Sequence, residues 1–269
     1  MIAKQFAKQI RQWALKMVTG AKASHIASAL SIADIIAVLY ANVLHLNPAN
    51  PKMANRDRFI LSKGHACIAV YAALAERGFF PVSELETYGC DDSNLMSHIS
   101  HHVPGVEFST GSLGHGLPFG VGKALAAKHL QANWRTFVLL SDGEMDEGSN
   151  WEALLFSAHH RLDHLVAIID YNHLQSLTSV EKTLGLEPLA AKLQSFGWSV
   201  QEGNGHDHHA LHQMLGSAPW ESGKPSILIA QTTKGKGVSF MENKVEWHYK
   251  SPTPKQLEAA LSELEASDA

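Results

Sequence analysis

The sequence predicts an α/β protein with a mainly parallel sheet flanked by helices on both faces. Two apolar runs, 136–140 (TFVLL) and 165–170 (LVAIID), are predicted to be buried strands, and a helix-like segment joins them. Further strands and helices alternate along the chain, which is typical of parallel sheets with helical crossovers. No internal repeat or linker divides the 269 residues, so we expect a single domain over 1–269.

The amino-terminal segment is predicted to be an amphipathic helix. Phe6, Ile10, Trp13, Ala14 and Met17 recur at spacings of three and four residues. The same segment is basic and has no acidic residue before position 34, which superficially resembles a transit peptide. The amphipathic spacing favours the helix.

The remaining elements complete the alternation. Ser31 is expected to cap a helix over 32–44 (IADIIAVLYANVL), which is apolar nearly all round and therefore buried. In chain order, the other predicted elements are strand 58–61, helix 65–77, helix 116–130, strand 136–140, helix 148–161, strand 165–170, helix 188–196, strand 198–201, helix 210–215, strand 226–231 and a carboxy-terminal helix over about 253–265.

The composition is that of an ordinary globular protein, with 45% hydrophobic residues, 18% charged residues and a net charge of −4. We expect no nucleic-acid partner because there is no basic excess, and no membrane partner because no run of eighteen or more apolar residues occurs. Cys67 and Cys90 lack metal-ligand spacing. We therefore expect free thiols, a reducing compartment and a cytoplasmic location.

Polar residues follow the two central strands. Asp142 lies just after the first apolar run and Asn172 just after the second, so both should reach the same edge of a parallel sheet. With the carbonyl of Leu174, they offer the oxygen ligands that Mg2+ prefers. Gly143 leaves room for a phosphate, and the helix opening near Gly148 directs N–H groups toward it. On pattern alone, a plain Asp-Gly turn with an unrelated loop asparagine is an equal alternative.

The stretch from Ser141 to Gln175 resembles the thiamine diphosphate motif, in which GDG is followed after a fixed interval by Asn. Here 28 residues lie between Gly143 and Asn172, and Ser141 stands where the family usually has Gly.

Two other segments resemble the amino-terminal half of transketolases. Residues 56–66 (RDRFILSKGHA) are similar to RDRFxLSxGH. Residues 104–117 (PGVEFSTGSLGHGL) are similar to PGVExxTGxLGQG, with His115 in place of Gln. The similarity extends from about Arg11 to Pro252, nearly the whole chain.

The resemblance implies the thiamine diphosphate-binding fold and a set of site residues. The implied ligands of a divalent metal, Mg2+ with Ca2+ or Mn2+ as alternatives, are Asp142, Asn172 and the carbonyl of Leu174. The implied cofactor-binding residues are His65, Gly111, Ser112, Leu113, Gly143, Glu147, Asn172 and His248. Glu147 could accept hydrogen bonds from groups that themselves hold the cofactor, or be part of a relay between paired sites; a charge interacting with a helix dipole is an equal alternative.

Four of the 17 histidines match family positions. His65 is implied to contact the phosphates, His25 and His248 to lie near the reacting hydroxyl groups, and His98 to reach the substrate. Imidazole can exchange protons with sugar hydroxyls near neutral pH, so His25, His248 and His98 are our candidate catalytic residues. The segment 234–237 (KGKG) lacks the form of a phosphate loop, and the resemblance places it near the cofactor.

The resemblance implies one half of a split transketolase. The family's pyrimidine-binding and carboxy-terminal domains are missing, and with them the glutamate that activates the cofactor. We therefore expect these parts to be supplied by a separate carboxy-terminal subunit, in a heterotetramer with two copies of each chain.

The implied reaction moves a two-carbon ketol unit from a ketose phosphate to an aldose phosphate, as in pentose phosphate metabolism. Alternatives are half of a 2-oxo acid dehydrogenase E1 or of a deoxyxylulose phosphate synthase, or a transketolase for a special sugar such as apulose 4-phosphate. A non-catalytic protein that retained the fold is a further alternative.

Overall fold

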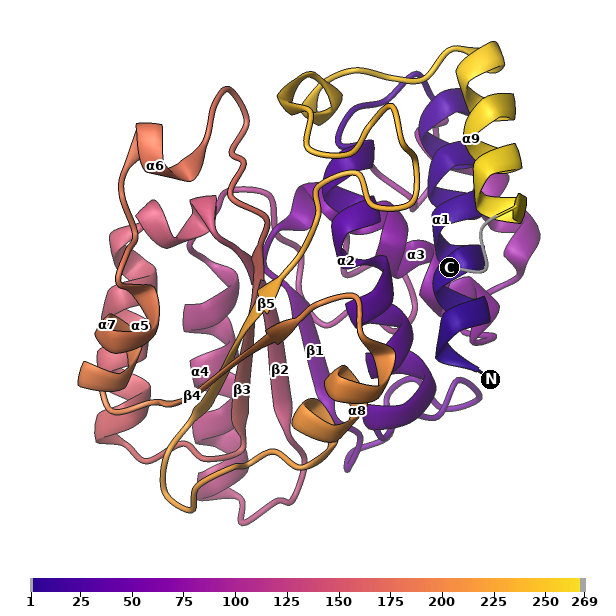
Figure 1. Ribbon diagram of the computed structural model, residues 1–269. Coiled ribbons are helices and arrows are strands. Elements are labelled where there is room, and N and C mark those ends of the chain that lie inside the picture. Colours follow the sequence, from indigo (N-terminus) through magenta and orange to yellow (C-terminus); the bar gives the residue numbers. More distant parts are fainter. Residues whose placement is uncertain (1, 267–269) are drawn as a thin grey trace.

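The computed structural model describes residues 2–266 and contains a five-stranded sheet in the order β1-β2-β3-β5-β4 (Figure 1). Every pair of neighbouring strands is parallel, which confirms the predicted α/β architecture. The strands are β1 (Arg58–Leu61), β2 (Thr136–Ser141), β3 (Leu165–Tyr171), β4 (Ser199–Asn204) and β5 (Ser226–Gln231).

Helices connect these strands and extend beyond them at both ends of the described chain. They are α1 (Ala3–Gly20), α2 (Ile26–Val38), α3 (Cys67–Glu76), α4 (Gly116–His129), α5 (Gly148–His159), α6 (Val180–Thr183), α7 (Leu189–Ser195), α8 (His208–Gly216) and α9 (Pro254–Ala266). A π-helical turn (Leu39–Val43) extends α2, and 3-10 turns occupy Gly64–Ala66, Val82–Thr87, Gly143–Asp146 and Val245–His248. Residues 267–269 of the predicted domain lie outside the described residues.

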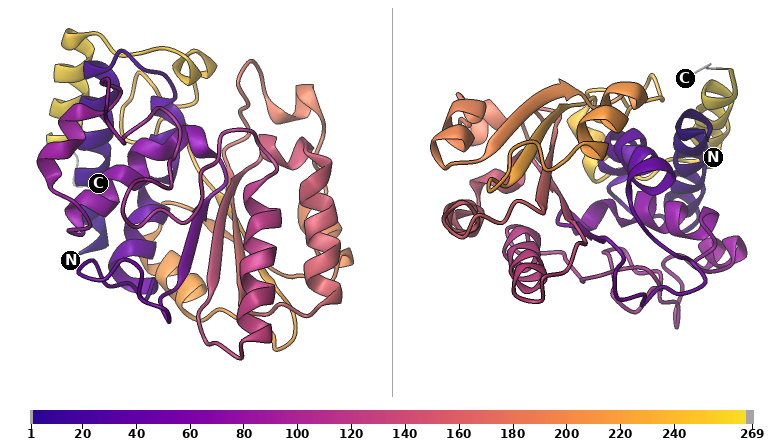
Figure 2. Two further views of the ribbon diagram at one scale, coloured as in Figure 1. Left: turned by 180° about the vertical axis from the view of Figure 1, so that it is seen from behind. Right: turned by 90° about the horizontal axis from the view of Figure 1, so that it is seen from below.

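The sheet separates two hydrophobic cores because successive side chains of a strand point to opposite faces. On β2, Phe137 and Leu139 pack into one core, and Val138 and Leu140 pack into the other. Helices α1, α2, α3, α8 and α9 contribute to the first core, and α4, α5 and α7 contribute to the second. Figure 2 shows the sheet between these two layers of helices.

The predicted amphipathic helix at the amino terminus corresponds to α1. Phe6, Ile10, Ala14 and Met17 are buried, and α1 packs against α2, α3 and α9. This burial explains the spacing of apolar residues at three and four positions along the segment.

The prediction that Ser31 caps the second helix is wrong. Helix α2 begins at Ile26, directly after His25, whose backbone is left-handed with φ 72°. Ser31 lies inside the helix, is fully buried, and donates a 2.7 Å hydrogen bond to Oδ2 of Asp170 on β3. A hydroxyl inside this apolar helix is therefore explained by a tertiary partner, not by a helix end.

Among residues 2–266, one continuous helical stretch, Ile26–Val43, is long and apolar enough to cross a membrane by length and composition. Within the protein 89% of this stretch is buried, as is also found for core helices of globular proteins.

Candidate active site

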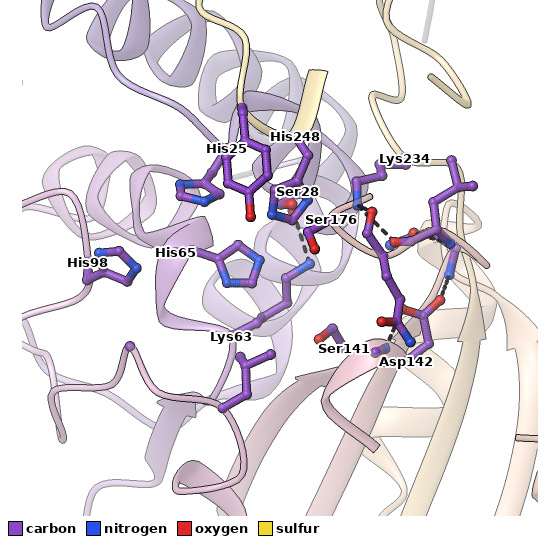
Figure 3. A pocket seen from close by; sticks show the side chains of 17 residues that line it. His25, Ser28, Lys63, His65, His98, Ser141, Asp142, Ser176, Lys234 and His248 are labelled. Atoms are coloured by element: carbon purple, nitrogen blue, oxygen red, sulfur yellow. Dashed lines mark hydrogen bonds between the residues drawn. The ribbon is translucent and has the colours of Figure 1, made fainter. Parts of the chain in front are cut away.

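A pocket of about 260 Å³ lies at the carboxyl edge of the sheet, where the segments after β1, β2, β3 and β5 meet (Figure 3). This position agrees with the general rule that open parallel sheets bind ligands beyond the carboxyl ends of their strands. The pocket is lined by His25, Ser28, Lys63, His65, His98, Gly111, Leu113, Ser141, Asp142, Gly143, Asn172, Leu174, Gln175, Ser176, Lys234, His248 and Tyr249.

The carboxylate of Asp142 joins the ends of β2 and β3. Oδ1 accepts a 2.8 Å hydrogen bond from the backbone N–H of Gly143. Oδ2 accepts from the backbone N–H groups of Asn172 at 2.9 Å and His173 at 2.6 Å. Burial and the nearby carboxylate of Asp170 raise the pKa of Asp142 to about 6, and these hydrogen bonds oppose the rise. The carboxylate therefore lacks a sufficient positive partner of its own.

The side-chain amide of Asn172 has a defined orientation. Its Nδ2 donates a 3.1 Å hydrogen bond to Oδ2 of Asp170, and its Oδ1 accepts a 3.2 Å bond from the N–H of Leu174. Because Asp170 can only accept while ionised, the amide nitrogen must face it, and the amide oxygen remains available as a ligand atom.

Asp170 is a fully buried carboxylate that gathers donors from several segments. Lys63 forms a 2.5 Å ion pair with it, and Thr232 donates a further hydrogen bond from the segment after β5. Burial alone would raise the pKa of Asp170, but Lys63 and the hydrogen bonds hold that pKa below its ordinary value. Asp170 therefore stays ionised and fixes both Lys63 and the amide of Asn172.

Lys234 projects into the pocket from the segment after β5 (Figure 3). Its ammonium donates to the carbonyl of Leu174 at 2.8 Å and to that of Gln175 at 3.3 Å. Burial and the neighbouring charge of Lys63 lower the pKa of Lys234 to about 8. Two lysines thus face a pocket that also holds the two carboxylates Asp142 and Asp170 around its floor, an arrangement suited to an anion bound together with a cation.

All four histidines singled out in the sequence meet on the other side of this pocket. The ring of His25 lies 5.1 Å from those of His65 and His248 and 5.9 Å from that of His98, measured between centroids. The rings of His65 and His248 are 5.6 Å apart. Residues separated by more than 200 positions in the sequence therefore form one imidazole cluster beside the polar edge of the sheet (Figure 3).

Local backbone contacts hold these histidines in place. The N–H of His25 donates to the carbonyl of His248 at 2.8 Å, which ties the start of α2 to the 3-10 turn at Val245–His248. Tyr71 on α3 donates from its hydroxyl to the carbonyl of His98 at 3.0 Å and accepts from the N–H of Ser100 at 3.1 Å. The loop that carries His98 is thereby fixed against the core.

Burial determines the protonation of the cluster. It lowers the pKa of His25 to about 4 and that of His248 to about 3, with further lowering from neighbouring lysines and histidines. Burial and Lys63 also lower the pKa of His65. These imidazoles are therefore neutral at pH 7. Nδ1 of His248 is buried and, within residues 2–266, has no hydrogen-bond partner, which leaves it available to a ligand.

The glycine-rich loop before α4 is attached to the sheet by a buried glutamate. Oε1 of Glu144 accepts from the N–H of Gly114 at 2.9 Å and from the hydroxyl of Ser62. The N–H of Glu144 donates to the hydroxyl of Ser141 at 3.3 Å, so the serine that replaces the family's usual glycine is used as an acceptor. Gly111, at the start of this loop, leaves only enough room for the ring of His98, which would lie 3.4 Å from an added Cβ.

The structure does not bring every predicted residue to the pocket. Ser112 is adjacent to Gly111 and Leu113 but is absent from the lining. Glu147 is exposed at the amino terminus of α5, also away from the pocket. The remaining predicted residues line the same cavity.

Several lining residues carry no signal of their own in the sequence. They are Ser28, Lys63, Ser141, Gln175, Ser176 and Tyr249. Ser28 lies one helical turn after His25, and Lys63 lies two residues before His65 in the SKGH segment, so proximity to recognised residues was the available signal. Asp170 lacks even that signal because it ends an apolar run and its partners are distant in sequence.

Comparison with known proteins agrees with this geometry. Residues 2–261 match the sequence profile of the family described as "Transketolase, thiamine diphosphate binding domain". This chain belongs to the transketolase family. As a transketolase-family member it is 42% identical over 254 residues to an apulose-4-phosphate transketolase subunit of Phocaeicola vulgatus, covering 94% of this chain and 90% of that protein. It is 39% identical to "6-deoxy-6-sulfo-D-fructose transketolase subunit SqwG" of a Clostridium species, covering 98% of this chain and 96% of that protein.

Solved transketolases share the fold over almost the whole chain. The transketolase from Leishmania mexicana superposes with a TM-score of 0.93 at 29% identity, covering 98% of this chain and 41% of that one. The transketolase from Campylobacter jejuni gives a TM-score of 0.92 at 30% identity, covering 98% and 43%. This transketolase-family chain therefore spans less than half the length of these solved structures.

Proposed function

We propose that this chain is the thiamine diphosphate-binding subunit of a two-subunit transketolase. With a separate carboxy-terminal subunit, it would transfer a two-carbon ketol unit from a ketose phosphate to an aldose phosphate. The observation that carries the proposal is the meeting of His25, His65, His98 and His248 with the polar tips of β2 and β3 in one pocket. Two relatives of comparable length are themselves named as subunits of transketolases, which supports the need for a partner.

The residues at the strand tips fit a hard divalent cation such as Mg2+, with Ca2+ or Mn2+ as alternatives. Asp142, Asn172 and the carbonyl of Leu174 supply three oxygen atoms of the type that Mg2+ prefers. Oδ1 of Asp142 accepts one hydrogen bond, so a lone pair remains for a metal. Within residues 2–266 no group of three or more His, Cys, Asp or Glu side chains is arranged to hold a metal, so phosphate and water oxygens would complete the coordination.

The basic side chains fit the diphosphate of the cofactor. Lys63 and Lys234 line the pocket, and Gly143 has space next to the flexible side chain of Gln175. When bound, thiamine diphosphate supplies the nucleophilic carbon that accepts and then passes on the two-carbon unit. His65 is placed on the same side as Lys63 and would contact the phosphates.

The remaining histidines would handle the sugar. As neutral imidazoles at pH 7, His25 and His248 can accept a hydrogen bond from a hydroxyl or donate one, and can take up a proton briefly as a bond to carbon breaks. His98, beside Gly111, would orient the substrate. These contacts would position the sugar and would also exclude water from the reacting carbons.

The substrate is proposed to be a ketose with an anionic group at its far end. One relative is named for apulose 4-phosphate and another for 6-deoxy-6-sulfo-D-fructose, so phosphate and sulfonate sugars both belong in the test panel. We place the assembly in the cytoplasm as a heterotetramer, with the activating glutamate supplied by the partner subunit.

The decisive experiment combines this chain with the carboxy-terminal subunit encoded beside it and measures ketol transfer. Thiamine diphosphate and Mg2+ are supplied, and the panel includes xylulose 5-phosphate, apulose 4-phosphate and a sulfonated ketose. We expect transfer from at least one donor, and loss of transfer in Asp142→Ala but not in Asp91→Ala, an exposed control. No transfer from any donor, in a complex that binds cofactor, would reject the proposal. Release of carbon dioxide from pyruvate would instead indicate a 2-oxo acid dehydrogenase or a deoxyxylulose phosphate synthase.

A further inference from the structure

A second group of charged residues lies outside the pocket, around Asp34 on α2. Asp34 is buried, with 4% of its surface exposed, and both of its oxygens are in use. Arg11 on α1 donates to Oδ1 at 3.1 Å and to Oδ2 at 2.5 Å. His208 contacts Oδ1 at 2.8 Å, and His206 contacts Oδ2 at 2.7 Å. The carboxylate thus joins two helices to the segment between β4 and α8.

The second ring nitrogen of His206 contacts the segment after β5. Nε2 of His206 accepts a 2.8 Å hydrogen bond from the backbone N–H of Thr233. Because Thr233 donates, Nε2 must carry a lone pair, and the ring proton must lie on Nδ1, facing Asp34. Asp34 therefore selects the neutral Nδ1–H tautomer that can accept from Thr233.

Thr233 directly precedes Lys234, whose ammonium reaches the floor of the pocket. The same segment is held on both sides of this position. Gly235 donates its N–H to the carbonyl of Ala27 at 3.0 Å, and Nε of Arg11 donates to the carbonyl of Lys236 at 3.0 Å. The contact with His206 therefore fixes the backbone immediately before the lysine, and the Arg11 contact fixes it two residues after.

We infer that Asp34 and His206 are positioning residues that place the ammonium of Lys234 for an anionic diphosphate ligand. The inference rests on the proposed cofactor site, since Lys234 is the group through which the pair acts. Neither Asp34 nor His206 lines that pocket, so any effect must pass through the backbone of Thr233.

Two substitutions at His206 separate its two hydrogen bonds. In His206→Gln, the longer amide can accept from Thr233 but gives up the geometry of the Nδ1–H donor. In His206→Asn, the shorter amide can donate to Asp34 but cannot reach Thr233. In the complex with the partner subunit, we expect the KM for thiamine diphosphate to stay within about threefold of wild type in His206→Gln and to rise about tenfold in His206→Asn, the loss of one hydrogen bond. At saturating cofactor, kcat should change less than KM.

His208→Asn is the matched control. His208 shares the carboxylate of Asp34, and its contact with that carboxylate does not extend to the segment 232–237. We expect its thermal stability to fall as in the His206 variants, with an unchanged KM for the cofactor. An equal rise in KM for His206→Gln and His206→Asn, or a similar rise for His208→Asn, would reduce Asp34 and His206 to a structural role.

Two measurements on the full chain without cofactor keep this inference separate from the proposed function. Long-range 1H–15N spectra should show an Nδ1–H tautomer that disappears in His206→Gln. Hydrogen–deuterium exchange over 232–237 should be faster in His206→Asn than in His206→Gln. A proton on Nε2 of His206, or equal exchange in the two variants, would overturn the inference. Absence of cofactor binding by the wild-type complex would instead count against the proposed function alone.

Discussion

The ammonium of Lys234 donates a 2.8 Å hydrogen bond to the carbonyl of Leu174, the backbone oxygen that we propose as a metal ligand. The protein therefore places one of its own positive charges where a divalent cation and a diphosphate would meet. A lysine whose pKa is lowered to about 8 can lose or move that charge at modest cost, which a fixed arginine could not do.

Replacing Lys234 by glutamine should have opposite effects on the two ligands. Without cofactor, Mn2+ should bind more tightly, because the carbonyl of Leu174 is released and a repulsive charge is gone. Thiamine diphosphate should bind about tenfold more weakly, since a charged hydrogen bond is worth about 1.5–3 kcal/mol. Titration calorimetry of each ligand measures both effects. Lys236→Gln, two residues away, is the control, and weaker Mn2+ binding in Lys234→Gln would contradict this account.

The buried pair Lys63–Asp170 should show strong coupling in a double-mutant cycle. Lys63 is 1% and Asp170 is 0% exposed, so removing either partner leaves an uncompensated charge in the core. We expect Asp170→Asn and Lys63→Met each to lower the free energy of unfolding by about 3–5 kcal/mol. The double variant should lose less than the sum. Urea denaturation measures all four proteins, and additive losses would show that the pair is not energetically linked.

Two glycines at the pocket should respond differently to alanine. At Gly64 an added Cβ would lie 2.3 Å from the backbone oxygen of Thr110, which cannot move without displacing its loop. At Gly143 it would lie 2.9 Å from Cγ of Gln175, a flexible side chain. We expect Gly64→Ala to cost about 1–3 kcal/mol of stability and Gly143→Ala less than about 1 kcal/mol.

Cofactor affinity provides the second readout for the glycine pair. Gly143→Ala should still weaken thiamine diphosphate binding, because the displaced Gln175 and the new methyl group narrow the approach to the backbone. A stable Gly143→Ala protein with unchanged affinity would argue against a phosphate at this position.

The histidine cluster predicts that stability falls in mild acid. The folded-state pKa is about 4 for His25 and about 3 for His248, against an ordinary value of 6.5. Between these values the unfolded chain binds more protons than the folded one, so this contribution is complete above pH 6.5 and is lost as the pH falls toward 4 and 3. Asp142, whose pKa is raised from 3.8 to about 6, acts in the opposite direction over that range.

A single variant isolates the histidine contribution. From pH 6.5 to 4, His248→Asn should lose stability less steeply than the wild type, as followed by urea denaturation at each pH. Both proteins retain Asp142, so its contribution cancels in the comparison. A steeper loss in His248→Asn would contradict the lowered pKa.

Apolar patterning was sufficient to predict the sheet. Strands β1 and β5 have the bounds expected from the runs 58–61 and 226–231, because short apolar segments between polar residues have few other ways to be buried. The motif residues Asp142 and Asn172 meet because parallel strands bring their carboxyl ends to one edge. The four matched histidines meet there as well.

Long-range polar contacts could not be predicted in this way. Ser31 resembles a helix cap locally, but its partner Asp170 is 139 positions away. Lys63 and Asp170 are 107 positions apart, and nothing in either local segment indicates an ion pair. Motif matching also favoured the exposed Glu147 over Glu144, whose burial depends on the loop before α4.

The common direction of the five strands has a practical use. The turn at Gln131–Asn133 precedes β2 and therefore lies at the end of the sheet remote from the histidines. A cysteine introduced at Gln131, with exposed Cys90 changed to serine, would allow the chain to be tethered to a sensor chip with its mouth toward the flowing buffer. Ligands and the companion chain could then be passed over an immobilised layer without masking the place where they dock.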